Sequence, residues 1–174
     1  MEQWQQLKKR LETERPTPWD GLPDILLYMD QVLSYLPRQH MGAEEGEGIT
    51  SAMVNNYVKE GLLPRAEGKR YSRTHLGYLT AISALKQVLS VRDMQTLIRA
   101  GEEGQDPEKI YDYFLSALDQ ALSEAASELP EETEEGDLPK LALAFALRSY
   151  ADRLACQRII AMLRPREPEK KKKK

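Results

Sequence analysis

Apolar residues recur at helical spacing along most of the chain, and each such stretch predicts an amphipathic helix. The clearest stretches lie within residues 24–36 and 72–88, where apolar side chains return every three or four positions. Between them, residues 51–60 predict a shorter helix, which Thr50 caps and Gly61 ends. These three segments are expected to pack together around one core.

The same periodicity and clear start and stop signals predict further helices on both sides of this core. Asp106 followed by Pro107 is typical of a helix start, Gly101 of a helix end, and Asp137 can cap the last helix. In chain order, these helices are predicted over residues 1–15, 90–100, 107–129 and 138–163.

Two segments lack helical periodicity. Residues 64–71 contain proline, glycine and basic side chains, and they predict either a short strand-turn-strand hairpin or a loop. Residues 38–48 are rich in glycine and acidic side chains, and we expect a mobile loop there. The fold class is therefore predicted to be all-α with a small β wing at residues 64–71.

The polar side of the predicted helix over residues 51–60 is a candidate DNA-reading surface. Ser51, Asn55, Asn56 and Lys59 all carry hydrogen-bonding side chains on that side. Two adjacent Asn residues weaken a helix, and a role for their amides in binding adenine edges or phosphate oxygens would explain that cost. The alternative is a solvated helix face with no ligand.

Four cations follow within nine residues: Arg65, Lys69, Arg70 and Arg73. Each alone is more often a solvated charge than a ligand, but together they form the best candidate cluster for phosphate contact in the chain. The surrounding charge supports this interpretation. Residues 50–100 carry eight Lys or Arg against three Asp or Glu, a net charge of +5, whereas the whole chain has a net charge of -3.

The order of these motifs resembles the DNA-binding domain of MerR-type regulators. In that family an aromatic-bearing recognition helix ends in Gly-Leu-Leu-Pro, a basic wing ends in Tyr-Ser, and a further helix follows. The matching residues here are 55–57, 61–64 and 69–72, followed by the helix from Arg73. With LLYMDQV at residues 26–32 and LKQVLSV at residues 85–91, the order is also similar to the uncharacterised bacterial YkrK-like family, regarded as MerR-like.

The resemblance implies a MerR-like winged helix-turn-helix that acts as a sequence-specific transcriptional regulator on double-stranded DNA. We expect that domain over residues 23–100, after an N-terminal arm at residues 1–22. A two-helix C-terminal extension at residues 101–164 and a disordered basic tail at residues 165–174 follow. The operator sequence, the direction of regulation and any effector are left open.

The last predicted helix is apolar on nearly every side at LALAFAL, residues 141–147. Such a helix must be covered all round, either by the rest of its own chain or by a second copy. We expect a homodimer, which agrees with the two-fold symmetry common among helix-turn-helix proteins. The alternative is a monomer whose two C-terminal helices bury most of their own surface.

Several other classes of function are not expected. No apolar run reaches membrane-spanning length and the N-terminus lacks a signal-peptide core, so the protein is expected to be cytoplasmic. Cys156 is interpreted as a buried structural thiol, and His75 as a surface or phosphate-adjacent residue. No metal site, cofactor or enzymatic activity is predicted, because neither a metal-ligand cluster nor a nucleophile with a partner base is present.

A second hypothesis is a protein-protein interaction module that uses the winged helix without specific DNA binding. In that case the acidic residues 131–137 or the last helix would be the docking surface.

Overall fold

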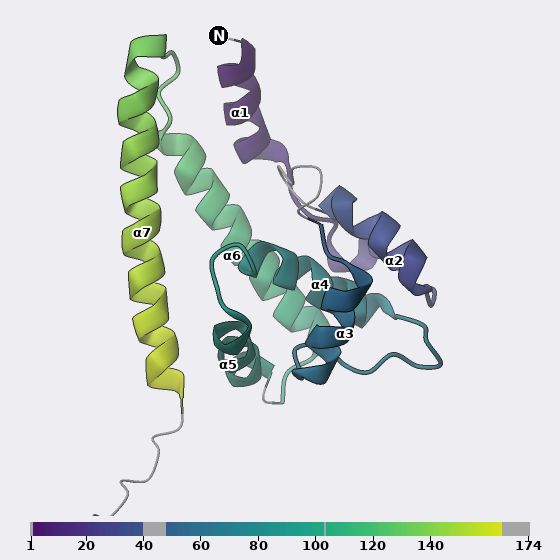
Figure 1. The fold of residues 1–174 in the computed structure, drawn as a ribbon. Helices are drawn as coiled ribbons and strands as arrows, with labels where there is room; N and C mark the ends of the chain where they lie inside the picture. The colour runs from purple at the N-terminus through teal and green to yellow at the C-terminus, as the bar shows by residue number, and fades with distance from the viewer. Residues whose placement is uncertain (1, 40–47, 103, 165–174) are drawn as a thin grey trace, which may run out of the picture.

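A computed structural model describes residues 2–39, 48–102 and 104–164. These described residues form three short 3₁₀ helices, at Trp19–Gly21, Leu36–Gln39 and Glu135–Asp137. The α-helices, in chain order, are α1 (Glu2–Thr13), α2 (Met29–Tyr35), α3 (Ser51–Lys59), α4 (Arg73–Leu85), α5 (Val91–Glu102), α6 (Pro107–Glu128) and α7 (Leu138–Leu163), as drawn in Figure 1.

Helix α4 lies at the centre of the hydrophobic core. Its side chains Leu76, Leu79 and Ile82 are fully buried. Val32 of α2 and Val54 of α3 are also completely inaccessible and belong to the same core cluster. Helix α6 packs against α4, so the core is formed by elements from both halves of the chain.

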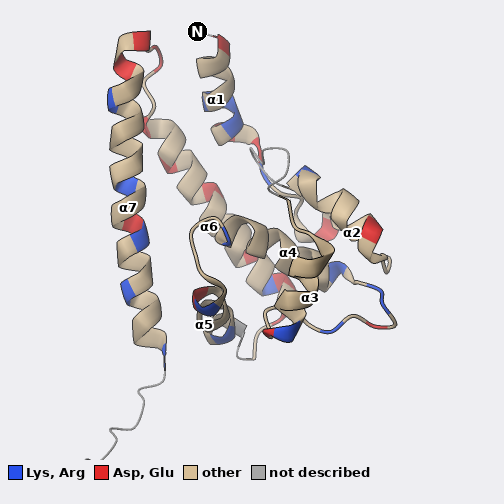
Figure 2. Ribbon diagram, viewed as in Figure 1, with Lys and Arg blue, Asp and Glu red and all other residues tan. Residues whose placement is uncertain are grey.

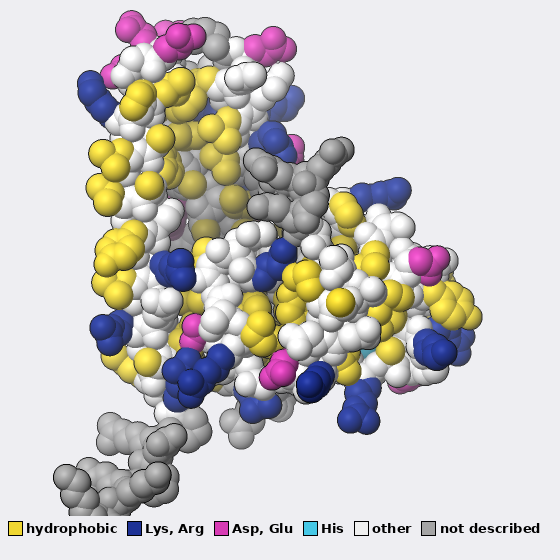
Figure 3. Space-filling view, in the orientation of Figure 1, with side chains coloured by type: hydrophobic (Ala, Val, Ile, Leu, Met, Phe, Trp, Pro, Cys, Tyr) yellow, Lys and Arg dark blue, Asp and Glu magenta, His cyan; other side chains and the backbone are white. Residues whose placement is uncertain are grey.

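The N- and C-terminal helices extend away from this core. Helix α1 packs against α6, where the indole nitrogen of Trp4 donates to the Pro130 carbonyl at 3.1 Å and Arg15 pairs with Asp119 at 2.6 Å. Helix α7 packs against α5 and runs alongside α6 (Figure 1). An apolar groove lies between α1, α6 and α7 (Figure 3). The groove has a volume of about 1270 Å³.

The predicted β wing is wrong, because residues 64–71 form a loop and the described residues contain no β-strand. The loop turns through Gly68 and Lys69, both with positive φ, and one antiparallel bridge joins Glu67 to Arg70. Tyr71 pairs with Leu27, its amide donating at 2.8 Å and its carbonyl accepting at 2.9 Å. The next residue that could pair across the turn is Ser72, but as the cap of α4 its amide donates to Nδ1 of His75 at 3.0 Å and its carbonyl accepts from the Leu76 amide at 3.2 Å. The turn is therefore closed by a single bridge, and no wing forms.

The pairing between Leu27 and Tyr71 shortens the first core helix. Residues 24–36 were expected to be one helix, but residues 24–28 are not helical and α2 begins only at Met29. The backbone of Leu27 is held extended by its bridge to Tyr71, and the Gln31 side chain accepts from the Tyr28 amide at 2.9 Å. Ile25 therefore stays exposed although it fits the apolar pattern.

The other helices agree closely with the sequence prediction. Helix α3 ends before Gly61, α6 starts at Pro107, and α7 covers the predicted residues 138–163. Helix α5 passes through Gly101, which was expected to end it. Cys156 is half-buried against the core.

Two predicted segments lie outside the described residues: most of the loop at residues 38–48, and the basic tail at residues 165–174. Within the described part of the chain, no helix is long and apolar enough to span a membrane.

Truncating a buried α4 side chain should destabilise the protein far more than the same change on the surface. We expect Ile82→Ala to lower the free energy of unfolding by about 2–5 kcal/mol, because it leaves a cavity in the core. Ile159→Ala on α7 removes the same atoms from a side chain that is 59% exposed, and it should cost less than about 1 kcal/mol. Urea denaturation followed by circular dichroism measures both, and equal losses would contradict the central position of α4.

Candidate nucleic-acid interface

Helix α3 has one buried and one open side. Val54 and Tyr57 are buried in the core and fix the helix from behind. Ser51, Asn55 and Lys59 are exposed and follow one another at intervals of four residues, so they form a single polar row. Asn56 is exposed beside this row. The structure therefore brings together all four polar residues predicted on this helix.

Both ends of α3 are fixed by hydrogen bonds. The Thr50 hydroxyl accepts from the Met53 amide at 3.3 Å at the start of the helix. At the other end, Gly61 has φ +71°, its amide donates to the Val58 carbonyl at 3.1 Å, and the Leu62 amide donates to the Tyr57 carbonyl at 2.8 Å. This is a Schellman cap, and it explains why glycine stands at this position.

The loop formed by residues 64–70, called the basic loop below, carries three free cations. Arg65, Lys69 and Arg70 are exposed, and none of them forms an ion pair with a described residue. The turn is held by reciprocal hydrogen bonds of 3.1 and 3.0 Å between the backbones of Glu67 and Arg70. Because Arg65, Lys69 and Arg70 are exposed and form no ion pair with a described residue, their charges are available to a ligand.

The fourth predicted cation, Arg73, is placed differently. Its side chain is only 23% exposed, and it pairs with Asp24 at 3.4 Å. Its guanidinium also lies 5.9 Å from the centroid of the Trp19 ring, within the range of a cation–π contact. Arg73 thus joins the start of α4 to the segment before α2, while the other three cations point to solvent.

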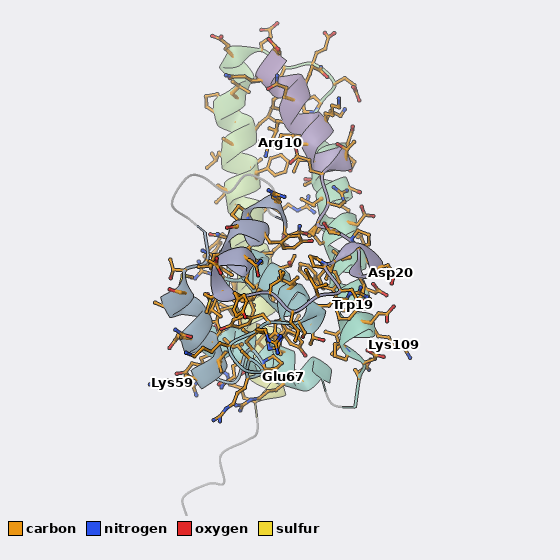
Figure 4. The ribbon with its side chains drawn as sticks, turned by 90° about the vertical axis from the view of Figure 1, so that its right-hand side faces the viewer. Arg10, Trp19, Asp20, Lys59, Glu67 and Lys109 are labelled. Carbon is orange, nitrogen blue, oxygen red and sulfur yellow. The ribbon has the colours of Figure 1, made fainter. Side chains whose placement is uncertain are left out.

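The polar row of α3 and the basic loop lie at the same end of the molecule. In Figure 4, Lys59 at the end of α3 and Glu67 in the basic loop stand at a similar level, far from Arg10 of α1. Figure 2 marks Lys and Arg positions on the ribbon of α3, α5 and the basic loop, and Figure 3 shows Lys and Arg side chains along this lower edge. Helix α7 packs on α5 and leaves the polar side of α3 exposed.

One further cation at this end was missed by the sequence analysis. Arg99 of α5 is exposed, and one of its terminal nitrogens lies 3.5 Å from the position that a Cβ would take at Gly61. The neighbouring turn of α5 contributes Gln95, whose side-chain amide donates to the Glu60 carbonyl. Helical periodicity places Gln95 and Arg99 on one side of α5, but it does not indicate which helix that side meets.

His75 belongs to the core rather than to the surface, contrary to expectation. It is 5% exposed, and its Nδ1 atom accepts from the Ser72 amide at 3.0 Å, which completes a capping box at the start of α4. Its ring also meets Tyr71 edge-on at 5.4 Å between centroids. Burial lowers the pKa of His75 from the ordinary value of 6.5, and the backbone of Arg65 and Pro64 and the charge of Glu67 partly offset this.

This shift predicts a pH-dependent stability. Because the pKa is lower in the folded state, the contribution of neutral His75 is complete above pH 6.5 and is lost as the pH falls below that value. The His75→Gln variant keeps an acceptor for the capping box but cannot titrate. Urea midpoints measured between pH 7.5 and 5.5 should therefore fall more steeply for the natural chain than for this variant. Parallel curves would show that His75 does not contribute.

Nothing in the described part of the chain suggests a metal centre at this surface or elsewhere, because no group of three or more His, Cys, Asp or Glu residues is close enough to hold an ion.

Comparison with known proteins identifies one family. A family model described as a domain of unknown function (DUF1836) matches residues 17–114, which is more than half of the chain. The chain therefore belongs to the DUF1836 family. No curated protein and no solved structure matches it.

Proposed function

We propose that this member of the DUF1836 family binds double-stranded DNA through α3 and the basic loop, and that it acts as a sequence-specific transcriptional regulator. The observation that supports this function best is that two kinds of side chain lie at the same end of the molecule. An open row of amide, hydroxyl and ammonium groups on α3 lies at that end together with three cations that form no ion pair with a described residue. Amides can read base edges, and cations can bind phosphates.

The dimensions of α3 suit the major groove. Its nine residues span about 13.5 Å along the helix axis. The major groove is about 12 Å wide, which admits a single helix. Val54 and Tyr57 anchor the inner side in the core, so the outer side can approach bases without exposing apolar surface. Asn55 and Asn56 can each offer a donor and an acceptor to the N6 and N7 atoms of adenine.

The basic loop supplies the contacts that do not depend on sequence. Arg65, Lys69 and Arg70 are exposed and unpaired within the described structure, so they can approach phosphates without first breaking an ion pair. Lys59 and Arg99 add positive charge beside the end of α3. These cations explain how a protein with an overall net charge of -3 would bind a polyanion, because the local field decides the contact.

The similarity to MerR-type regulators adds support at the level of motif order. A helix that ends in Gly61-Leu62-Leu63-Pro64, a basic segment and a second helix from Arg73 follow one another as in that family. The proposal does not need a β wing, because phosphate contact requires accessible cations and not strand pairing.

Removing the charges of the basic loop should weaken DNA binding and reduce its dependence on salt. For the triple variant Arg65→Gln, Lys69→Gln, Arg70→Gln, we expect the slope of log K against log salt concentration to become shallower by about 3, roughly one unit for each lost phosphate contact. Fluorescence anisotropy with a labelled random duplex at several salt concentrations measures this slope.

A matched control distinguishes the effect of the basic loop on the salt dependence from the effect of net charge. The triple variant Lys9→Gln, Arg10→Gln, Lys140→Gln also removes three exposed cations, but from α1 and the start of α7, at the far end of the molecule. Its slope should remain that of the natural chain. Equal slopes in both triple variants would overturn the assignment of the basic loop.

Replacing the two amides should affect sequence preference rather than general affinity. We expect Asn55→Ala, Asn56→Ala to lose about 1–3 kcal/mol of preference for each base pair that an amide reads, while binding of random duplex stays nearly constant. Selection of bound duplexes from a random library measures the preference, with Gln6→Ala on α1 as the control.

The result of that selection also distinguishes specific DNA binding from the interaction-module hypothesis. If the natural chain enriches no sequence over the double variant and binds duplex no better than the basic-loop variant, DNA is not the ligand of this surface.

A further inference from the structure

Helix α7 has two apolar sides, and only one of them is covered. The covered side meets the body of the protein, with Ile160 buried and Phe145 and Cys156 half-buried. The other side bears four large apolar side chains that are 60%, 60%, 68% and 43% exposed, in the order Leu143, Leu147, Tyr150 and Leu154. We call these four residues the α7 stripe.

The α7 stripe has the spacing of a coiled-coil seam. Its members are separated by four, three and four residues, so they line up along one side of the helix over about 16 Å. Exposed alanines flank it at Ala144, Ala146 and Ala151, and their small side chains allow a second helix to approach closely. Figure 3 shows the apolar side chains along the edge of the molecule over α7.

We propose that the α7 stripe is covered by the α7 stripe of a second copy of this chain, with the two helices antiparallel about a two-fold axis. In this arrangement Leu143 of one copy lies opposite Leu154 of the other, and Leu147 lies opposite Tyr150. The stripe is thus complementary to itself, as a two-fold interface requires. A single contiguous apolar seam of this kind is uncommon on a monomer.

The distribution of charge along α7 selects the antiparallel arrangement. The turn before α7 is acidic, with Glu134, Glu135 and Asp137 all exposed (Figure 2). The C-terminal half of α7 bears Arg153 and Arg158, which are exposed and form no ion pair with a described residue. Antiparallel helices bring each acidic turn to the basic end of the other copy, whereas parallel helices bring like charges together.

The arginine closest to the seam illustrates the match. Arg158 follows Leu154 by four residues, so it continues the direction of the α7 stripe. With Leu143 opposite Leu154, Arg158 lies opposite residue 139 of the second copy and therefore within one helical turn of its Asp137. Asp137 already pairs with Lys140 of its own chain at 3.4 Å, so Glu134 and Glu135 supply the uncompensated negative charge of this turn. A parallel pair would place Arg158 opposite Arg158 of the second copy.

The mass of the full chain in solution tests the dimer. Light scattering coupled to size-exclusion chromatography should give twice the chain mass of 19.9 kDa at micromolar concentration. The variant Leu147→Glu, Tyr150→Glu should give a single chain mass with an unchanged helical circular-dichroism spectrum. Ile159→Glu, an equally exposed apolar position of α7 outside the stripe, should remain dimeric. A natural chain of single mass at about 100 μM, or a stripe variant that remains dimeric, would overturn the proposal.

Charge reversal tests the direction of the helices. Either Arg153→Glu, Arg158→Glu or Glu134→Lys, Glu135→Lys alone should raise the dimer dissociation constant about tenfold, because like charges then meet at both ends. All four changes in one chain should restore it. In a parallel dimer none of the three variants would differ from the natural chain, and that result would exclude the antiparallel arrangement. Since no DNA is present, these outcomes are independent of the proposed DNA binding.

Discussion

The arrangement of the candidate surface depends on two backbone hydrogen bonds between Leu27 and Tyr71. They bond both backbone groups of Tyr71 to the segment before α2, at 2.8 and 2.9 Å. They hold the segment before α2 extended, so α2 starts only at Met29. They also fix the end of the basic loop beside the start of α4, where Ser72 caps the helix and His75 completes its capping box. The Leu27 and Tyr71 side chains are themselves buried, which protects these bonds from water.

The helices could be predicted from the sequence because their signals are local. Thr50, Gly61 and the pair Asp106-Pro107 each fix a helix end through hydrogen bonds within a few residues. The start of α2 could not be predicted, since the pairing that holds Leu27 extended joins residues 44 positions apart. The β wing was predicted wrongly because Ser72, which would have paired across the turn, caps α4 instead. The α3 row was predicted correctly as exposed, because apolar periodicity separates its two sides. Arg73 and Arg99 show the limit of that reasoning: their surroundings are set by Asp24, Trp19 and Gly61, which only tertiary structure brings close.

The segment matched by the DUF1836 family closes upon itself in space. It runs from Thr17 to Phe114, and its ends meet where the Tyr111 hydroxyl donates to the Thr17 carbonyl at 2.8 Å. The Tyr111 and Trp19 rings lie 6.0 Å apart, and the Gly77 backbone passes so close to both that a Cβ there would stand 3.2 and 3.3 Å from them. Burial raises the pKa of Tyr111 to about 12, so its hydroxyl keeps its proton and remains a donor. The family segment thus ends within α6, and α7 lies outside it.

The Schellman cap at Gly61 has a consequence for how α3 can meet a ligand. With Thr50 bonded at one end, Gly61 and the Gln95 contact at the other, and Val54 and Tyr57 buried behind, the helix has little freedom left to lose. Association with a partner normally costs conformational entropy for each segment that becomes ordered. Here that cost was met during folding, so the backbone that carries the amide row of α3 is already ordered in the absence of a ligand.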